Sequence, residues 1–184
     1  MTHLRFIATP LEGLRLIERH VFSDHRGRFA RLYCAEELKA AGITLPVAQI
    51  NHSYTAHRGA VRGLHFQHPP HGEDKIITCL RGEVFDVAID LRRGSPTLLR
   101  WHGELLSAAN ARSLLVPQGF AHGFQALSDD CELLYLHTRA YAPEAEDGVN
   151  ARDPAVAIAW PLPFSDVSER DAARALLPPG FPGI

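Results

Sequence analysis

The spacing of the turn signals is the feature that most constrains the fold of this chain. Apolar or alternating runs recur about every ten residues. Clusters of glycine, proline and aspartate separate them, as at Asp24–Gly27, Arg81–Gly82 and Gly94–Pro96. Only 35–41 and 168–177 have the pattern of a helix. Many short strands with little helix predict an all-β sandwich or barrel.

The expected strands belong to a single domain, because no repeat, linker or low-complexity segment divides the chain. We expect N-terminal strands and a helix over 1–45, a barrel over 46–162, and a C-terminal helix and tail over 163–184. Eight strands can close into a barrel that encloses one ligand. The strands are predicted at 14–20, 29–33, 47–54, 75–80, 83–91, 97–106, 112–116, 131–138 and 155–160, with a further one starting at 61.

Charge and hydropathy exclude several classes of partner. The 184 residues carry a net charge of −2, so no basic excess points to nucleic acid. The chain has no secretory leader and no apolar run of about 18 residues, so we expect a cytoplasmic protein without a membrane partner. The cysteines form no C-x-x-C motif, and Cys79 and Cys131 are expected as small reduced hydrophobes within strands.

The stretch from Val61 to Pro70 carries the residues around which the expected function is organised. It has the pattern of a strand that bears Arg62, His65 and Gln67, and its two prolines end the strand because proline cannot donate to a sheet ladder. Lys75 opens the next strand. Cationic groups and a titratable imidazole near strand ends favour acid–base chemistry on an anionic small molecule. The alternative for His65 is a hydrogen-bonded core histidine.

Alternation predicts which side chains share a face of two other strands. In 47–54, Gln49, Asn51 and Ser53 point one way, which suits either a polar cavity wall or a solvent-facing surface. In 131–138, Tyr135 and His137 lie on one face with two apolar residues.

A second histidine, His122, lies in a turn rich in proline and glycine. It ends a P-x-G-x-x-H pattern, which is the last part of a cupin metal site. Gln67 stands where the second histidine of an H-x-H pair would fall, and His65 and His68 face opposite sides of a strand. The loss of one ligand weakens a metal site. We therefore expect a cupin-like barrel that holds no metal.

The motifs, in their order and spacing, resemble the dTDP-4-dehydrorhamnose 3,5-epimerase family, the RmlC-like cupins. The resemblance extends over almost the whole chain and implies an all-β, cupin-like β-barrel, or jelly roll, with short peripheral helices. The matching positions are Asp24-x-Arg26-Gly27-x-Phe29, Gln49-x-Asn51-x-Ser53, Arg62-Gly63-Leu64-His65-Phe66-Gln67, Lys75, Gly82-Glu83-Val84-Phe85-Asp86-Val87, Ser95-Pro96-Thr97, Trp101, Leu106-Ser107, Pro117-x-Gly119-Phe120-Ala121-His122-Gly123-Phe124, Tyr135, Tyr141-x-Pro143, Asp153-Pro154, Ile158-x-Trp160-Pro161 and Asp171.

The resemblance implies a cofactor-independent isomerase that acts on a nucleotide-linked 4-keto-6-deoxyhexose. The ketone at carbon 4 acidifies the hydrogens on carbons 3 and 5, so a base removes a proton and an acid returns one on the other face. His65 matches the family's general base. Asp171 matches the acid that orients this histidine. A capping role at the start of the C-terminal helix, where Ser168 stands three residues earlier, stays open for Asp171.

Two further catalytic roles follow from the resemblance. Tyr135 matches the proton donor on the opposite face of the sugar, and Lys75 matches the cation that stabilises the enolate oxygen. A core tyrosine and a solvated lysine at a strand end are the alternatives. The resemblance also implies a substrate-binding set, in which arginines suit pyrophosphate and a tyrosine stacks on the nucleobase. These residues are Arg26, Phe29, Arg31, Gln49, Asn51, Arg62, His122, Tyr141 and Glu146.

Arg31 departs from the family pattern, which has a nucleotide-contacting glutamate at this position. A carboxylate accepts hydrogen bonds, whereas a guanidinium only donates them. We expect a dTDP-linked substrate, with a CDP-linked sugar as the alternative.

The resemblance implies a homodimer in which the strand at 26–31 helps to build the neighbouring chain's pocket. The alternatives are an epimerase that inverts carbon 3 or carbon 5 alone, a catalytically silent cupin that binds a sugar nucleotide, and a metal-dependent cupin oxygenase or isomerase. Gln67 disfavours the last of these. The joint presence of the four residues that match catalytic roles disfavours the silent cupin.

Overall fold

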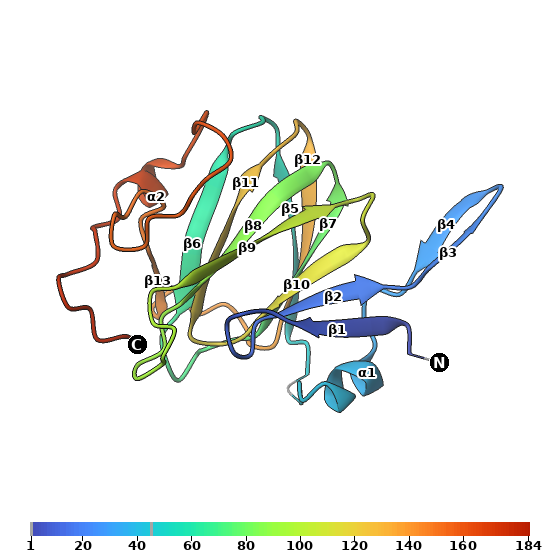
Figure 1. Cartoon of the computed structure of the whole chain (residues 1–184), viewed down its shortest axis with the longest axis horizontal. Helices are drawn as coiled ribbons and strands as arrows, with labels where there is room; N and C mark the ends of the chain where they lie inside the picture. The colour runs from blue at the N-terminus through green and yellow to red at the C-terminus, as the bar shows by residue number, and fades with distance from the viewer. Residues whose placement is uncertain (1, 45) are drawn as a thin grey trace.

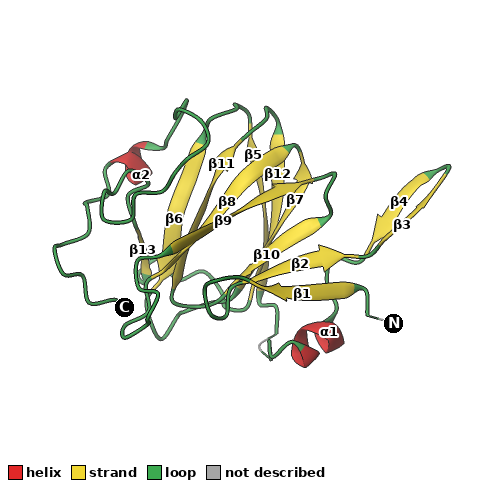
Figure 2. Ribbon diagram, in the orientation of Figure 1, coloured by secondary structure: helices red, strands yellow, loops and turns green. Residues whose placement is uncertain are grey.

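The computed structural model describes residues 2–44 and 46–184 and consists mainly of β-strands (Figure 2). The strands are β1 (Leu4–Ala8), β2 (Arg15–Arg19), β3 (Val21–Asp24), β4 (Gly27–Ala30), β5 (Gln49–Thr55), β6 (Val61–Gln67), β7 (Lys75–Arg81), β8 (Glu83–Asp90), β9 (Trp101–Ser107), β10 (Arg112–Val116), β11 (Phe120–Ala126), β12 (Cys131–His137) and β13 (Glu146–Gly148). Two short helices accompany them, α1 (Ala35–Ala40) and α2 (Glu169–Ala172). The predicted all-β class is confirmed.

The strands form two sheets that pack against each other, and a separate hairpin (Figure 1). The larger sheet has six strands in the order β1-β2-β10-β7-β12-β5, and the smaller has five in the order β13-β6-β11-β8-β9. Neighbouring strands in both sheets are antiparallel. This arrangement is the jelly roll expected from the sequence.

A hydrophobic core fills the space between the two sheets. Leu16, Ile77 and Leu114 face inward from the larger sheet, and Leu106 and Phe124 meet them from the smaller sheet. All five side chains are buried, so they hold the sheets in a fixed relative position. The strand ends beyond this core are left free to carry polar side chains.

The outer face of the smaller sheet is covered by the C-terminal part of the chain. Trp160, Phe164 and Val167 pack against a second apolar cluster that includes Leu64 and Ile89. This cover explains why β11 is buried along its whole length. In Figure 1 the C-terminal segment and α2 lie beside β6.

Residues 155–160, predicted as a strand, instead form a turn and an irregular segment. The Ala157 N–H donates to the Asp153 carbonyl at 2.9 Å, and Ala157 itself has a φ of +51°. The apolar residues that suggested a strand, such as Ile158 and Trp160, pack individually onto the sheet without joining it. The apolar pattern therefore reported burial but not backbone pairing.

The predicted C-terminal helix over 168–177 is much shorter than expected, because α2 ends at Ala172. Beyond it, the Leu177 N–H donates to the Asp153 carboxylate at 2.6 Å, and the Asn150 amide donates to the Arg174 carbonyl at 2.8 Å. These contacts fasten the segment to a distant loop in a non-helical path.

Several predicted strand boundaries also shift. The strand predicted at 97–106 begins only at Trp101, because the hydroxyls of Ser95 and Thr97 each donate to the buried Asp90 carboxylate at 2.6 Å and hold a turn. The strand predicted at 29–33 ends at Ala30, and that predicted at 47–54 runs from Gln49 to Thr55. Strands β1, β3, β11 and β13 were not expected from the sequence.

The β3–β4 hairpin extends away from both sheets (Figure 1). Its tip carries Arg26, and Phe29 on β4 is 72% exposed. The boundary placed at residue 45 falls outside the described residues, and the division of the chain at 45 and 162 stays a prediction. Neither α1 nor α2, the helices of the described residues, has the length and apolar character of a membrane span.

Candidate active site

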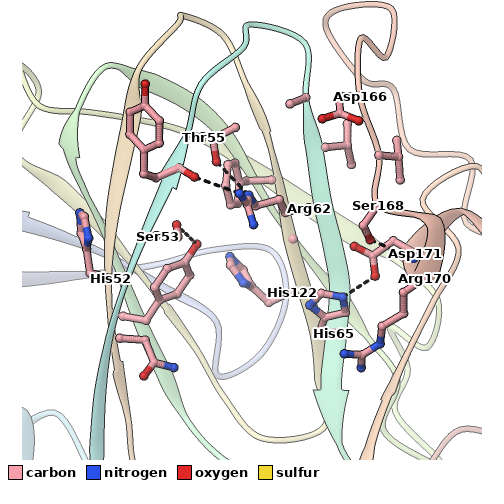
Figure 3. Close-up of a pocket in the computed structure, with 18 of the residues that line it drawn as sticks. His52, Ser53, Thr55, Arg62, His65, His122, Asp166, Ser168, Arg170 and Asp171 are labelled. Carbon is pink, nitrogen blue, oxygen red and sulfur yellow. Dashed lines mark hydrogen bonds and ion pairs between the residues drawn. The ribbon is translucent and has the colours of Figure 1, made fainter.

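A cavity of about 960 Å³ opens between the two sheets, at the strand ends beyond the core. Most of its wall comes from β5, β6, β11 and β12, and residues 166–171 close one side (Figure 3). Of the predicted site residues, the cavity wall contains Asn51, Arg62, His65, Lys75, His122, Tyr135 and Asp171. Its size is in the range of small-molecule sites.

Strand pairing brings these residues together from distant parts of the chain. His65 on β6 is paired with His122 on β11, within the smaller sheet. Tyr135 on β12 is paired with Asn51 on β5, within the larger sheet. The two pairs therefore face each other from opposite walls.

Close approach of β6 and β11 requires glycine beside the paired histidines. Gly63 has a φ of +104°, and a Cβ on it would lie 2.7 Å from the His122 carbonyl oxygen. No other residue type tolerates both the positive φ and this contact. The Arg-Gly-x-His spacing thus places Arg62 and His65 in one wall without separating the strands.

His65 and Asp171 form a close polar contact at the cavity wall. The His65 Nε2 lies 2.7 Å from the Asp171 Oδ1, and the Asp171 Oδ2 accepts the Gly63 N–H at 3.2 Å (Figure 3). Burial raises the pKa of Asp171, but the hydrogen bond and charge of His65, together with the contacts of Gly63 and Ser168, lower the pKa by more, to about 2. The ionised carboxylate accepts the Nε2 proton, so Nδ1, which faces the cavity, carries the lone pair.

The structure decides between the alternatives left open for these two residues. His65 lines the cavity and is not enclosed in the core. The capping group of α2 is Ser168, whose Oγ accepts the Asp171 N–H at 3.1 Å. Asp171 therefore takes part in the cap through its backbone N–H, while its carboxylate faces His65, so both roles hold.

Tyr135 lies in the wall opposite His65. Its hydroxyl is 3.1 Å from the Ser53 Oγ, and its ring meets the His122 ring edge-on at 6.2 Å. Burial raises the pKa of Tyr135 well above its ordinary value. The phenol is therefore protonated at neutral pH, and its position in the cavity wall sets it apart from an ordinary core tyrosine.

Lys75 is buried, and the alternative of a solvated lysine is wrong. The residue is 9% exposed, its Nζ lies 3.1 Å from the Glu73 Oε1, and it donates to the His65 carbonyl at 3.4 Å. The ammonium is thus held at the cavity wall beside the residue expected to act as the base.

His122 forms a second histidine–carboxylate pair. Its Nε2 lies 2.9 Å from the Oδ1 of Asp86, whose side chain is completely buried. Burial raises the pKa of Asp86, and the neighbouring His122 lowers it in part. Among the described residues, the second carboxylate oxygen of Asp86 has no hydrogen-bond partner.

Two arginines reach the cavity from different elements. The Arg62 Nε donates to the Thr55 Oγ1 and its Nη2 donates to the Tyr54 carbonyl, both at 2.9 Å (Figure 3). Arg170 on α2 also lines the cavity, and its guanidinium lies 2.5 Å from the Glu146 carboxylate. Arg170 was not predicted from the sequence as a site residue, although it directly precedes Asp171.

Six predicted substrate-binding residues lie outside the cavity wall of a single chain. Gln49 and Tyr141 contact each other, since the Tyr141 N–H donates to the Gln49 Oε1 at 3.0 Å. The Tyr141 hydroxyl donates to Glu146 at 2.5 Å, which connects both to Arg170 at the cavity. Arg26 and Phe29 lie on the hairpin and do not reach this cavity.

Arg31 also lies away from the cavity, where its guanidinium forms an ion pair with Glu37 on α1. The same carboxylate accepts the backbone N–H groups of His3 and Leu4, at 2.9 Å and 2.7 Å. Glu37 therefore ties the segment after the hairpin to the start of β1.

Both ends of the Gln67 side-chain amide bind the backbone of neighbouring loops. Its Oε1 accepts the Ala142 N–H at 2.6 Å, and its Nε2 donates to the His71 carbonyl at 3.1 Å. His68 instead contacts Asp147 outside the cavity. No group of three or more His, Cys, Asp or Glu side chains in residues 2–44 and 46–184 is arranged to hold a metal ion. Metal-independent activity stays a prediction.

Two further residues, one in the cavity wall and one behind it, were not assigned a role from the sequence. His137 lines the cavity two residues after Tyr135, as the alternation of β12 predicts. Glu73 lies behind it and is 9% exposed. Its signal in the sequence is an acidic residue two positions before Lys75, which is too common a pattern to identify a site.

Comparison with known proteins identifies a single family. The family model of the dTDP-4-dehydrorhamnose 3,5-epimerases matches residues 8–178. The enzyme of this name from Methanothermobacter thermautotrophicus is 43% identical over 175 residues, which cover 93% of each chain. A dTDP-4-dehydrorhamnose 3-epimerase from Streptomyces niveus is 42% identical over 175 residues, which cover 95% of this chain and 84% of the Streptomyces enzyme.

The fold agrees with the sequence comparison. The crystal structure of dTDP-4-dehydrorhamnose 3,5-epimerase from Bacillus anthracis, with TDP and PPi bound, superimposes with a TM-score of 0.91 at 39% identity. The superposition covers 95% of this chain and 99% of the Bacillus chain.

Proposed function

This chain belongs to the dTDP-4-dehydrorhamnose 3,5-epimerase family, and on that premise we propose that its cavity inverts carbons 3 and 5 of a dTDP-linked 4-keto-6-deoxyhexose. It is an isomerase. Epimerisation through an enolate leaves the oxidation state unchanged, so the proposal includes no redox cofactor and no metal. One observation carries it: His65, held by Asp171, faces Tyr135 across a single cavity.

His65 takes the proton from the substrate. Ionised Asp171 holds the imidazole as the tautomer with its proton on Nε2, so the Nδ1 lone pair faces the cavity (Figure 3). As Nδ1 accepts a proton from carbon 3 or carbon 5, positive charge develops on the ring. The carboxylate 2.7 Å away stabilises this charge.

Lys75 stabilises the enolate. When the proton leaves, the electron pair of the C–H bond moves toward the ketone, and negative charge develops on the oxygen at carbon 4. The Lys75 ammonium is fixed at the cavity wall by Glu73 and the His65 carbonyl, so it needs no reorganisation during the reaction. A preorganised donor at a developing oxyanion contributes about 10²–10³ in kcat.

Tyr135 returns a proton on the other face of the sugar ring. It projects from the larger sheet, whereas His65 projects from the smaller one, so base and acid approach a bound ring from opposite sides. Burial raises the pKa of Tyr135, so the proton is present when the enolate forms. The carbon of the enolate then takes this proton with inverted configuration.

The nucleotide diphosphate is held by the cationic side of the cavity. Arg62 is fixed by its contacts with Thr55 and Tyr54, and Arg170 approaches from α2. Guanidinium groups suit pyrophosphate because each presents paired N–H donors. Asn51 and the Gln49–Tyr141 contact extend the proposed nucleotide site along the rim.

We further propose a homodimer in which the β3–β4 hairpin completes the neighbouring chain's site. Arg26 and Phe29 match substrate-binding positions of the family, yet within one chain they lie on a projecting hairpin outside the cavity. The 72% exposure of Phe29 is high for an aromatic ring of this size and supports its burial against a partner.

The proposal includes a cytoplasmic location and a preference for dTDP. The three cysteines are free, and Cys79 and Cys131 are buried, which supports a reducing compartment. Arg31 is engaged by Glu37 within its own chain, so we expect its difference from the family glutamate to leave the dTDP preference in place.

Proton NMR of dTDP-4-keto-6-deoxyglucose with the purified protein in deuterated water tests the function. We expect deuterium to enter at carbons 3 and 5, with inversion at both. Exchange and inversion at carbon 3 alone would assign the chain to the activity of its 42%-identical 3-epimerase relative. Exchange at neither carbon would favour the silent binding protein.

His65→Asn is the matched variant for this assay. We expect it to lose deuterium exchange while it retains dTDP binding in calorimetry, because the variant removes the base but leaves the arginines in place. Exchange at the wild-type rate would remove His65 from the catalytic role.

A further inference from the structure

A line of hydrogen bonds runs from the Tyr141 backbone N–H to the His137 side chain. The Tyr141 N–H donates to the Gln49 Oε1 at 3.0 Å, and the Gln49 Nε2 donates to the Asn51 Oδ1 at 3.0 Å. The Asn51 Nδ2 then lies 3.4 Å from the His137 Nε2.

The line continues from His137 to the catalytic lysine. The His137 Nδ1 lies 2.8 Å from the Glu73 Oε2, and the other carboxylate oxygen of Glu73 lies 3.1 Å from the Lys75 Nζ. Strand pairing sets His137 beside Lys75, because β12 and β7 are neighbours and these two residues are opposite each other. The Glu73 carboxylate thus contacts His137 through one oxygen and Lys75 through the other.

The backbone determines the direction of every donor in this line. The Tyr141 N–H can only donate, so the Gln49 oxygen must face it and the Gln49 NH₂ must face Asn51. The Asn51 oxygen accepts that NH₂, which leaves the Asn51 NH₂ toward the His137 Nε2. The His137 Nε2 must therefore be an acceptor.

This requirement determines the tautomer of His137. With Nε2 accepting, the ring carries its proton on Nδ1 and is neutral, and Nδ1 donates to the Glu73 carboxylate at 2.8 Å. All donors from Tyr141 to Lys75 then point toward Glu73. Glu73 is 9% exposed, and burial raises its pKa, but its contacts with His137 and Lys75 together lower the pKa by more.

We propose that Glu73 and His137 are positioning residues of this site. The buried Glu73 carboxylate contacts both Lys75 and His137. Through it, Lys75 is held at the sugar end of the substrate and, by way of His137, Asn51 is held at the nucleotide end. The proposal rests on the epimerase function proposed above. Glu73 holds the ammonium that the enolate oxygen needs. His137, as the neutral Nδ1–H tautomer, orders the Asn51 amide in the proposed nucleotide region.

The arrangement differs from a purely structural ion pair in what each side chain controls. Glu73 acts on the chemical step through Lys75, whereas His137 acts on binding through Asn51. Loss of Glu73 should therefore lower kcat, and loss of the His137 Nε2 acceptor should raise KM. A pair that merely stabilised the fold would lower the melting temperature without this separation.

Nitrogen-15 NMR of the wild-type protein tests the tautomer directly. Long-range proton–nitrogen correlation spectra distinguish a ring that carries its proton on Nδ1 from one that carries it on Nε2, and His137→Asn assigns the signals. We expect the neutral Nδ1–H form of His137 at pH 7.5. The Nε2–H form or an imidazolium would overturn the proposal. This readout needs no activity, so it is independent of the epimerase assignment.

Kinetics of two variants test the separation of roles. In Glu73→Gln the lysine loses its counter-ion, and we expect kcat to fall by about tenfold or more, with little change in KM. In His137→Asn the amide NH₂ takes the place of Nδ1 and still reaches Glu73, but no acceptor remains for Asn51. We expect KM to rise roughly three- to tenfold, with kcat near the wild-type value.

The His102–Glu104 pair on β9 provides matched controls. Its atoms lie 3.1 Å apart and neither residue lines the cavity. His102→Asn and Glu104→Gln should leave kcat and KM unchanged. The proposal would be wrong if Glu73→Gln and His137→Asn had the kcat and KM of these controls. It would also be wrong if each of the two variants lowered kcat and raised KM together, in proportion to its loss of thermal stability. A wild-type protein without epimerase activity would refute the proposed function, while the NMR result would still decide the tautomer.

Discussion

Replacement of Asp171 by asparagine is expected to disable the base by moving a proton. Asp171 receives two donors, the Gly63 N–H at 3.2 Å and the His65 Nε2 at 2.7 Å. The backbone donor cannot change, so the asparagine oxygen stays with Gly63 and its NH₂ faces His65. Nε2 must then accept, and the imidazole proton moves to Nδ1, the nitrogen that should receive the substrate proton.

The structure sets the size of the effect. The pKa of Asp171 lies at about 2 instead of 3.8, since the contacts with His65, and with Gly63 and Ser168 beside it, outweigh the raising effect of burial. This difference corresponds to about 2 kcal/mol of preference for the carboxylate, or roughly thirtyfold in an equilibrium constant. The wrong tautomer adds to this loss, and in the Ser-His-Asp triad the same change costs about 10⁴ in kcat. We expect kcat to fall by about 10²–10⁴ with KM nearly unchanged.

The initial rate of deuterium incorporation measures this fall, and Asp171→Ala is the informative comparison. Alanine removes both the acceptor and the NH₂, so the His65 imidazole is free to adopt either tautomer. Asp171→Ala should therefore retain more activity than the more conservative Asp171→Asn. An asparagine variant that exchanges deuterium within a few-fold of wild type, or faster than the alanine variant, would refute the tautomer argument.

Four further predictions address other parts of the site. Tyr135→Phe should retain deuterium exchange but lose inversion in the same NMR assay, because the base remains and the opposite acid is gone; inversion at the wild-type rate would make Tyr135 an ordinary wall residue. Arg31→Ala should leave the affinity ranking of dTDP, UDP and CDP unchanged in calorimetry, because Arg31 is paired with Glu37; a changed ranking would show that it reads the base. Exhaustive chelation should leave activity intact, and a stoichiometric transition metal in elemental analysis, with activity lost on chelation, would contradict this. Because the pKa of Asp171 is lowered, its carboxylate contributes folding stability that is fully present above the ordinary pKa of 3.8 and is lost as the pH falls toward about 2. The free energy of unfolding, measured with urea, should therefore fall by about 2 kcal/mol more between pH 5 and pH 2.5 in wild type than in Asp171→Asn.

The local pattern of the sequence identified the walls of the cavity well. Alternation over 131–138 placed Tyr135 and His137 on one face, and both line the cavity. The polar face of 47–54 proved to be a cavity wall at Asn51 and Ser53. A strand repeats its side-chain direction every two residues, so a short segment contains enough information to predict its own two faces.

The same local pattern failed where side chains pack without backbone pairing. The apolar residues of 155–160 suggested a strand, but they cover the outside of the smaller sheet from an irregular segment. Periodicity reports which side chains are buried. It does not report whether a neighbouring strand is present to accept the backbone hydrogen bonds.

The sequence by itself determined the all-β class, the turn positions and the chemistry-bearing residue types, because these depend on neighbours only a few positions apart. Only the tertiary structure decided the partners: Asp171 meets His65 across 106 positions of sequence, and Glu73 meets His137 across 64. A hydrogen-bond partner depends on strand register and on which segment covers which sheet. Those are properties of the whole folded chain, so the proton positions on His65 and His137 could be derived only after the chain was folded.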